Sequence, residues 1–229
     1  MSYILNIETA TKNCSVALAK EGQTILCKEI AEEGYSHAER LHVFIEEMIQ
    51  EAGISFQDLK AIAVSQGPGS YTGLRIGVSA AKGLCYALNI PLIAVDTLQV
   101  LASQAKLTDG LLIPMLDARR MEVYSAIFNS KLEKQREVQA EIITENSFET
   151  IDETIYFLGD CSEKCQTVLV KPNFVFLEDI KYPSANEMSA LSYIKIQKKE
   201  FEDVAYFEPY YLKDFMITTS KEIITAFLN

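Results

Sequence analysis

The sequence predicts an α/β protein of two lobes, each built on a mixed β-sheet flanked by helices. Short apolar strands at the amino-terminal end follow one another as a meander and then alternate with helical segments, which is typical of a mixed sheet covered by helices. After Thr108-Asp109-Gly110 the same order begins again, so we expect an internal structural duplication. The first lobe is expected over residues 1–107, completed by the tail 206–229, and a smaller second lobe over residues 108–205.

The elements of the first lobe are expected where apolar runs alternate with turn residues. A helix is predicted to begin at Ser36, where Glu39 completes a capping box, and to end at Gly53. A second helix, rich in small residues, is predicted to follow a glycine turn and to end near Leu88. The remaining elements are strands at 3–8, 14–19, 24–30, 61–64 and 92–95, and a helix at 97–106.

The second lobe is predicted from the same signals. A helix capped by Ser184 is expected to reach Lys199, and a short helix is expected to carry Cys165. Another helix is expected around Phe148, whereas residues 131–141 form a charged segment to which we assign no element. Strands are predicted at 111–116, 121–128, 154–158 and 174–177, and an extended aromatic tail at 206–215.

The stretch from Gly67 to Gly83 permits two interpretations. A strand, a glycine turn and the amino end of a helix together favour anion binding, because free backbone N–H groups and the helix dipole point the same way. Inside the helix, however, Gly73, Gly77 and Ala81 recur every four residues, which leaves one face nearly bare for the close approach of another backbone. The motif has no Lys and is not a P-loop, so packing is the favoured interpretation.

Composition narrows the class of protein. The 229 residues carry a formal net charge of −11, which disfavours a self-sufficient nucleic-acid binder. The five cysteines include no C-x-x-C, and Cys161 and Cys165 have no second ligand pair beside them, so neither disulfides nor a zinc site is expected. Reduced thiols, an amino terminus without signal-peptide features and the lack of a long apolar run predict a cytoplasmic protein that does not enter a membrane.

Candidate catalytic groups are few. The two histidines, His37 and His42, are five residues apart, about 140° around a helix, so they are not expected to share a metal. Ser70 lacks the flanking glycines of a nucleophile elbow and is better explained as a helix cap. Asp117 and the pair Arg119-Arg120, at a strand end, either bind a ligand or form a solvated hairpin with a local Asp–Arg pair, and the hairpin is favoured.

Three segments together resemble the signatures of the TsaB family, also called YeaZ. They are ILNIETAT at residues 4–11, GPGSYTGLRIG at residues 67–77 and DARRMEVY at residues 117–124, and they occur in the right order. Residues 36–53 and 91–98 also match the family's pattern. The resemblance covers at least the first 125 residues, and its second segment is long and specific.

The resemblance implies a two-lobed fold of the actin, sugar-kinase and Hsp70 type, the ASKHA fold. It also implies a role in making threonylcarbamoyladenosine beside the tRNA anticodon, as a non-catalytic scaffold that binds the transferase TsaD together with the ATPase TsaE. TsaD binds its metal through a His-x-x-x-His pair on the helix after its glycine motif, where this chain has Lys82, Leu84 and Cys85. No catalytic residue and no metal site are therefore expected. Vestigial nucleotide-binding loops are expected at Glu8, Thr9, Gly67, Gly69 and Ser70.

On this resemblance we expect TsaD to dock on the two neighbouring helices of the first lobe. A homodimer is expected to use the same helices when the chain is alone. No cofactor is expected to bind tightly, ATP or ADP at the TsaD interface is left open, and tRNA is expected only within the complex. The residues expected at the interface are His37, Arg40, Leu41, Phe44, Ile45, Met48, Gly73, Arg75, Gly77, Val78 and Ala81.

Two other classes of function compete with the scaffold. One is an enzyme of the same superfamily, either an ATP-dependent phosphotransferase or a peptidase of the glycoprotease type, but the sequence offers no evident metal or base for it. The other is a module that binds tRNA directly, which the charge balance disfavours. The scaffold is the leading hypothesis.

Overall fold

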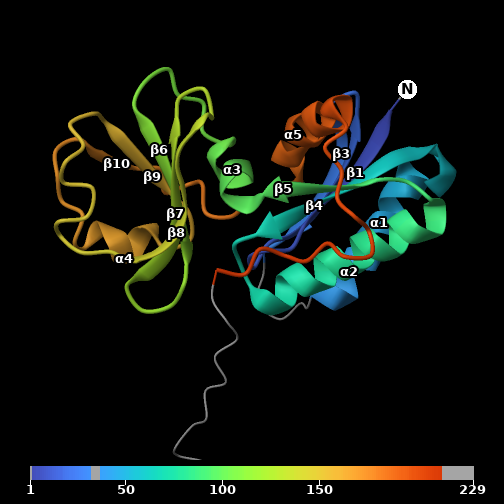
Figure 1. Ribbon diagram of the computed structural model, residues 1–229, viewed down its shortest axis with the longest axis horizontal. Coiled ribbons are helices and arrows are strands. Elements are labelled where there is room, and N and C mark those ends of the chain that lie inside the picture. Colours follow the sequence, from blue (N-terminus) through green and yellow to red (C-terminus); the bar gives the residue numbers. More distant parts are fainter. Residues whose placement is uncertain (1, 32–36, 213–229) are drawn as a thin grey trace, which may run out of the picture.

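Two five-stranded mixed β-sheets lie side by side and form the centres of two lobes (Figure 1). This computed structural model describes residues 2–31 and 37–212, and helices flank both sheets. The predicted two-lobed α/β fold is therefore confirmed. Within the described part of the chain, no helix is both long enough and apolar enough to cross a membrane.

The first sheet has the strand order β3-β2-β1-β4-β5. Its first three strands form the antiparallel meander that the sequence predicts, and β4 and β5 extend the sheet in parallel to β1. Parallel neighbours need a crossover connection, which a helix supplies between β4 and β5. The strands are β1 (Tyr3–Glu8), β2 (Cys14–Lys20), β3 (Gln23–Ile30), β4 (Leu59–Gly67) and β5 (Leu92–Asp96).

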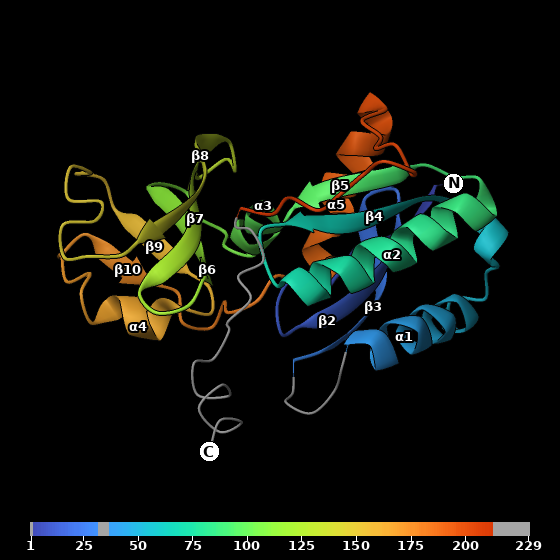
Figure 2. The same cartoon turned by 60° about the horizontal axis from the view of Figure 1, so that its bottom comes forward.

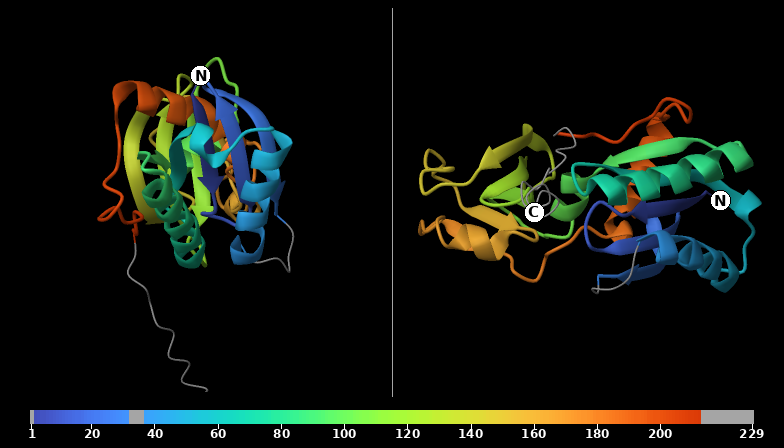
Figure 3. Two further views of the ribbon diagram at one scale, coloured as in Figure 1. Left: turned by 90° about the vertical axis from the view of Figure 1, so that its right-hand side faces the viewer. Right: turned by 90° about the horizontal axis from the view of Figure 1, so that it is seen from below.

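Two helices, α1 (His37–Glu51) and α2 (Tyr71–Leu88), cover one face of the first sheet (Figure 3). Apolar side chains at helical spacing on α1 turn towards the sheet and are buried there. The predicted cap Ser36 lies outside the described residues. The helix α2 ends at Asn89 in a left-handed conformation (φ 53°), close to the predicted end. A short helix, η1 (Phe56–Asp58), leads into β4.

The opposite face of the first sheet is covered by α5 (Ala185–Lys198), which comes after the second sheet in the chain. Ser184 caps this helix, as predicted, by accepting a hydrogen bond of 3.2 Å from the N–H of Asn186. Met188 packs between Ile4 and Ile93 in a shared apolar cluster. The sequence analysis placed all of residues 108–205 in the second lobe. In the structure, residues 185–198 of this range form α5 and pack on the first sheet.

The second sheet repeats the topology of the first. Its strand order is β8-β7-β6-β9-β10, with antiparallel pairing from β6 to β8 and parallel pairing from β6 to β10. The expected structural duplication is therefore present. The elements are β6 (Leu111–Asp117), β7 (Glu122–Asn129), β8 (Lys134–Ile142), β9 (Ile155–Leu158), α4 (Ser162–Gln166) and β10 (Phe174–Phe176). The helix α3 (Thr97–Ala102) packs its Leu98 and Leu101 on this sheet.

Three predictions of secondary structure differ from the structure. The helix predicted around Phe148 is wrong, because this residue lies in a series of turns with φ of 62°. The charged segment 131–141 contains the edge strand β8, whose side chains alternate between half-buried and exposed positions along much of its length. The helix predicted over 97–106 ends at Ala102, because Ser103 already begins a series of turns.

The segment 199–212 returns from α5 along the first lobe, and we call it the strap. Figure 2 shows it running past β5 and β4 towards the second lobe. Glu202 forms a bridge to Leu92 of β5, and the N–H of Tyr210 donates a hydrogen bond of 2.7 Å to the carbonyl oxygen of Gln66. The described part of the predicted tail therefore lies on the first lobe, and residues 213–229 lie outside the described residues.

Candidate functional site

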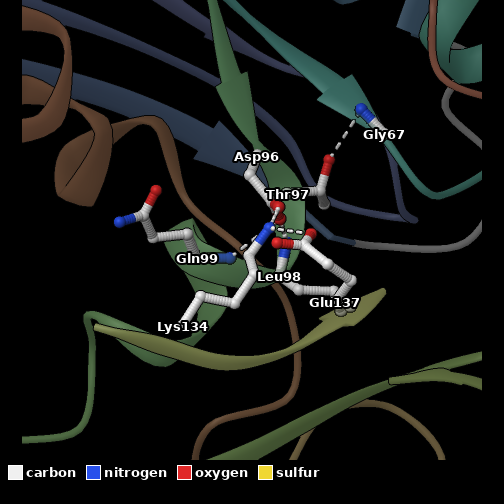
Figure 4. Close-up of polar contacts among 7 residues, drawn as sticks. All are labelled: Gly67, Asp96, Thr97, Leu98, Gln99, Lys134 and Glu137. Atoms are coloured by element: carbon white, nitrogen blue, oxygen red, sulfur yellow. Dashed lines mark hydrogen bonds and ion pairs between the residues drawn. The ribbon is translucent and has the colours of Figure 1, made fainter. Parts of the chain in front are cut away.

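The glycine turn between β4 and α2 is fixed by hydrogen bonds from three segments. The N–H of Gly67 donates 3.0 Å to the hydroxyl of Thr97 (Figure 4), and the N–H of Ser70 donates 2.6 Å to the carbonyl oxygen of Ala10. The hydroxyl of Ser70 caps α2 by accepting a 3.2 Å hydrogen bond from the N–H of Gly73. Gly67 has φ of 112°, which favours glycine. The turn is a rigid corner of the first lobe.

The space beside this turn is filled by the chain's own β1–β2 loop. A side chain at Gly69 would overlap Ala10, and one at Gly73 would overlap the carbonyl oxygen of Thr9. The hydroxyl of Thr9 donates a 2.8 Å hydrogen bond to the carbonyl oxygen of Gly73. The residues predicted as vestigial nucleotide loops are thus brought together, with the β1–β2 loop directly against Gly69 and Gly73.

The small-residue face of α2 turns inwards. Gly77 lies against the side chain of Thr9, Val78 and Ala81 are buried in the core, and Gly73 packs on the loop. In the structure these four residues face the core and the β1–β2 loop of the same chain, and their place at a partner interface stays a prediction. Three further residues of the predicted interface are also buried beneath α1, namely Leu41, Ile45 and Met48.

The four other predicted interface residues are at least partly accessible. Arg75 is exposed on α2, and its guanidinium lies 4.1 Å from the ring centre of Tyr71. Phe44 and Arg40 are half-buried on α1, whereas His37, at the first turn of α1, accepts or donates a 2.8 Å hydrogen bond with the carbonyl oxygen of Thr11. The accessible part of the helical interface predicted from sequence therefore lies on the outer side of α1 and α2.

The outer side of these helices carries residues that the sequence reasoning missed. Tyr86 is 85% exposed and Val43 is 40% exposed, and a side chain at Gly83 would meet open space. Thr72 and Ser79 are exposed on the same helix as Gly83. Their spacing of seven and four residues places them on one face, opposite the buried glycines, and this periodicity was the available signal.

Glu8 is a fully buried carboxyl group at the end of β1. Its Oε1 accepts a 2.6 Å hydrogen bond from the N–H of Ala10, whereas Oε2 has no hydrogen-bond partner among the described residues. Burial raises the pKa of Glu8 to about 7, and the hydrogen bond from Ala10 and the nearby hydroxyl of Ser65 offset only part of this shift. Glu8 therefore holds the loop that packs on the glycine turn, at an electrostatic cost.

The strap adds a second wall to the glycine turn. The ammonium group of Lys82 donates to the carbonyl oxygens of Ala205 (3.0 Å) and Phe207 (3.1 Å), so α2 is clamped to the strap. At the other end of the strap, Tyr211 packs its ring on that of Tyr71, with 4.9 Å between the ring centres. Lys82 of α2 thus has a structural task in this chain.

One ion pair links the two lobes directly (Figure 4). Lys134 of β8 lies 2.7 Å from Oδ2 of Asp96, whose Oδ1 caps α3 by accepting from the N–H groups of Leu98 (2.8 Å) and Gln99 (3.1 Å). Burial acts to lower the pKa of Lys134, but the hydrogen bonds and negative charges of Asp96 and Glu137 together outweigh it, so the pKa is raised. The carboxylate of Asp96 therefore caps α3 with one oxygen and binds Lys134 of the second lobe with the other.

A cleft of about 800 Å³ opens between the lobes. Its first-lobe wall includes the β1–β2 loop, the glycine turn and the end of the strap, and its second-lobe wall is the β6–β7 hairpin with Arg119 and Arg120. The carboxylate of Asp117 pairs with Lys164 and also accepts the backbone N–H of Arg119 at 2.9 Å. The predicted hairpin is present, but its ion pair is made with Lys164 of α4 instead of an arginine side chain.

The second lobe contains two buried cysteines and a tightly packed glycine near the cleft, and none of them forms a reactive centre. Cys161 and Cys165 are buried free thiols, and within the described residues no group of three His, Cys, Asp or Glu side chains is arranged to hold a metal ion. Gly159 (φ 124°) packs tightly on the backbone of Met115, and Asp160 accepts the N–H of Asp117 at 2.9 Å. Gly159 and Asp160 therefore hold the end of β9 against the end of β6, beside the cleft.

Over almost its whole length the chain is similar to a curated bacterial protein. It is 32% identical over 219 residues to the tRNA threonylcarbamoyladenosine biosynthesis protein TsaB of Bacillus subtilis, and the match covers 92% of this chain and 93% of that protein. The chain belongs to the TsaB family. This finding confirms the resemblance that the three sequence segments indicate.

Two further comparisons place this TsaB-family chain. It matches YeaZ from Pseudomonas aeruginosa with a TM-score of 0.80 and 26% sequence identity, over 93% of this chain and 100% of that one. The family model for TsaD, tRNA N6-adenosine threonylcarbamoyltransferase, matches residues 29–226. The corresponding transferase of Bacillus subtilis is 36% identical over 129 residues, which is 50% of this chain and 37% of that protein. TsaB-family and TsaD-family proteins are thus homologous.

Proposed function

We propose that this chain is a non-catalytic subunit for the threonylcarbamoylation of tRNA, which binds a TsaD-type transferase together with a TsaE-type ATPase. The observation that carries the proposal is the match to a TsaB protein over nearly the whole chain. The non-catalytic part is supported by the side chains present, because the described residues hold no group of three His, Cys, Asp or Glu side chains arranged for a metal ion. Because a subunit that takes part in tRNA modification has to be where tRNA is, we place the chain in the cytoplasm.

The docking surface for the transferase is the outer side of α1 and α2. This surface combines apolar side chains, such as Val43 and Tyr86, with small residues that let another helix approach, such as Ser79 and Gly83. Large apolar side chains that a monomer leaves exposed mark interaction sites when they gather on one surface. A specific contact of this kind buries about 800 Å² on each partner.

Homology between the two families supports the same geometry. Since about half of this chain resembles part of the transferase, the two proteins have related first lobes that can meet through equivalent helices. A second copy of this chain offers the same helices, so a homodimer forms when the transferase is absent. ATP or ADP, if it binds, lies at the interface with the transferase, and tRNA is contacted only in the complex, because the chain's net charge is −11.

Co-purification with the transferase tests the docking surface. Gly83→Arg introduces a large side chain into open space and replaces a poor helix former with a good one, so the chain stays folded. We expect the complex to be lost. The matched control is Ala190→Arg, at an exposed small residue of α5 on the opposite face of the sheet, which keeps the complex. If Gly83→Arg binds the transferase as the unchanged chain does, the surface is wrongly assigned.

Reconstitution tests the function itself. Transferase and ATPase are assayed for modified tRNA with and without this chain, and the chain is also assayed alone. Stimulation by a chain that has no activity by itself supports the scaffold. ATP hydrolysis or peptide cleavage by the pure chain, lost in Glu8→Gln or Ser70→Ala, supports the enzyme instead. Binding of tRNA by the isolated chain at physiological salt supports the tRNA-binding module.

A further inference from the structure

Residues 213–229, which we call the terminal segment, lie outside the described residues and carry the sequence pattern of a short amphipathic helix. Thr219 is followed by Glu222 three residues later, which is the pattern of a capping box. The apolar residues after it are spaced so that they share one face of a helix. They are Ile223, Ile224, Phe227 and Leu228. The sequence therefore predicts a helix over residues 220–228 with one apolar face.

A helix of this length needs a surface to pack on. Isolated helices shorter than about 12–15 residues are marginal in water, and in proteins most of their stability comes from burying an apolar face. Each of the four large apolar side chains gains about 1.5–3 kcal/mol when it is fully buried. The predicted helix is therefore expected to dock on a surface that its connection to residue 212 allows it to reach.

The described residues end beside the amino ends of α1 and α2. Tyr211 packs its ring on that of Tyr71 in the first turn of α2, with 4.9 Å between the ring centres. Leu212 lines the same cleft as His37, in the first turn of α1. Residues 213–219 span at most about 25 Å when fully extended, so the predicted helix can reach the outer side of both helices.

The outer side of α1 and α2 suits a helix with an apolar face. Thr72, Ser79 and Gly83 are exposed on one face of α2, and their small side chains allow another helix to approach closely. Val43 of α1 and Tyr86 of α2 are 40% and 85% exposed and supply apolar area to bury. Because α2 is 18 residues long, this surface extends over the whole length of the predicted helix.

Other exposed apolar side chains suit the predicted helix less well. Val170 is 78% exposed but lies between α4 and β10, at the end of the second lobe that is away from the first lobe (Figure 1). Ile142 is the single large apolar side chain that is exposed on β8. Ile194 lies on α5, which covers the opposite face of the first sheet. The end of the strap therefore favours α1 and α2 as the docking site.

We propose that residues 220–228 pack as a helix on the outer side of α1 and α2, where they cover the surface until the transferase displaces them. The terminal segment shields Val43 and Tyr86 from unspecific association. It also weakens the binding of the transferase, because only the fraction of chains with an uncovered surface can bind. This competition rests on the proposed function, whereas the packing of the terminal segment does not.

Fluorescence of a tryptophan placed in the terminal segment tests the packing, because the chain contains no tryptophan. In Phe227→Trp the indole lies on the apolar face, so we expect emission at short wavelength and protection from quenching by acrylamide. Thr225→Trp is the matched control on the polar side of the same predicted helix, and it should emit as an exposed indole does. Equal emission and equal quenching of the two variants would overturn the proposal.

A second substitution in Phe227→Trp tests which surface is covered. Gly83→Arg places a large charged side chain on the outer side of α2, so the emission should shift to that of an exposed indole. Ala190→Arg, on the exposed side of α5, should leave it unchanged. Unchanged emission with Gly83→Arg overturns the assignment, and so does a shift to exposed emission on dilution, because the segment then packs on a second copy. Urea midpoints show that the variants remain folded.

Titration with the transferase tests the competition. Ile224→Asp puts a charge on the apolar face and releases the terminal segment, so we expect about tenfold tighter binding of the transferase. Thr225→Asp is the matched control and should bind as the unchanged chain does. Equal affinity of Ile224→Asp and the unchanged chain overturns the competition. If none of these chains binds the transferase, the proposed function and the competition are both wrong, while the tryptophan emission still decides the packing.

Discussion

Glu8 and Asp117 end equivalent central strands of two sheets with the same topology, but they lie in opposite surroundings. Glu8 is fully buried and its pKa is raised to about 7. Asp117 is exposed and pairs with Lys164 at the edge of the cleft. The same position in a duplicated lobe thus anchors a packed loop in one case and orients a solvent-facing hairpin in the other.

The two lobes differ in the crossover that joins the two strands running parallel to each central strand. In the first lobe the crossover contains α2, 18 residues long, whose inner face presses on the β1–β2 loop and buries Glu8. In the second lobe the crossover contains α4, only five residues long, which leaves the β6–β7 hairpin open to the cleft. A long helix and a short one on the same sheet plan therefore give the two lobes different surroundings at the end of the central strand.

The largest effect is expected from breaking the close contact of the first lobe. Gly77→Leu forces a side chain into the hydroxyl of Thr9, and such overpacking should lower the free energy of unfolding by about 3 kcal/mol or more. Urea denaturation measures it. Gly83→Leu is the control on the outer face of the same helix, where a side chain fits and helix propensity improves. Equal stability of the two variants would contradict the inward orientation of the glycine face.

The next largest effect is a dependence of stability on pH that comes from Glu8. In the unfolded chain Glu8 ionises near pH 4.5, whereas in the folded chain it ionises near pH 7. Stability therefore falls as pH rises from 4.5 to 7, by about 3 kcal/mol, and stays constant above that range as far as Glu8 is concerned. Glu8→Gln should remove this dependence and be more stable than the unchanged chain at pH 8. Urea denaturation between pH 5 and 8 measures it, and parallel curves for the two proteins would refute the burial argument.

An intermediate effect is expected where the lobes are joined. Lys134→Ala removes the ion pair with Asp96 and leaves its largely buried carboxylate with backbone partners only. The free energy of unfolding should fall by about 1–3 kcal/mol. Chemical denaturation measures it, with Lys131→Ala as the exposed control. If the two alanine variants are equally stable, the pair contributes nothing to holding the lobes together.

The smallest effect on stability is expected at Asp117, the exposed counterpart of Glu8. Asp117→Asn breaks an ion pair whose carboxylate side chain is 47% exposed, so the loss of stability should stay below about 1 kcal/mol. A larger loss in a thermal or urea unfolding experiment would mean that the hairpin stabilises the second lobe as much as the packed loop stabilises the first.

Much of the first lobe could be predicted from sequence because local signals agree with the fold. The strands of the meander, the cap at Ser70 and the end of α2 near Leu88 all follow from short-range patterns. The edge strand β8 was missed because charged side chains mask its alternation. The helix expected around Phe148 failed because apolar residues in a turn can imitate a helical stripe.

The sequence pattern of α2 does not tell which way its small-residue face points. The spacing of Gly73, Gly77 and Ala81 shows that a backbone comes close, but it does not show whose backbone it is. The backbone in question is that of Thr9, more than sixty residues earlier in the chain. Its carbonyl and hydroxyl oxygens lie against Gly73 and Gly77. The pairing of Asp117 with Lys164 is of the same long-range kind. Such contacts have no periodic signal.

The position of α5 has a consequence for synthesis on the ribosome. The face of the first sheet that bears Ile4 and Ile93 is covered only when residues 185–198 return to it, after the second lobe has been made. Until then the growing chain exposes this apolar face, because all strands of the second sheet are synthesised before α5. The first lobe, which begins the chain, is therefore the last to be completed.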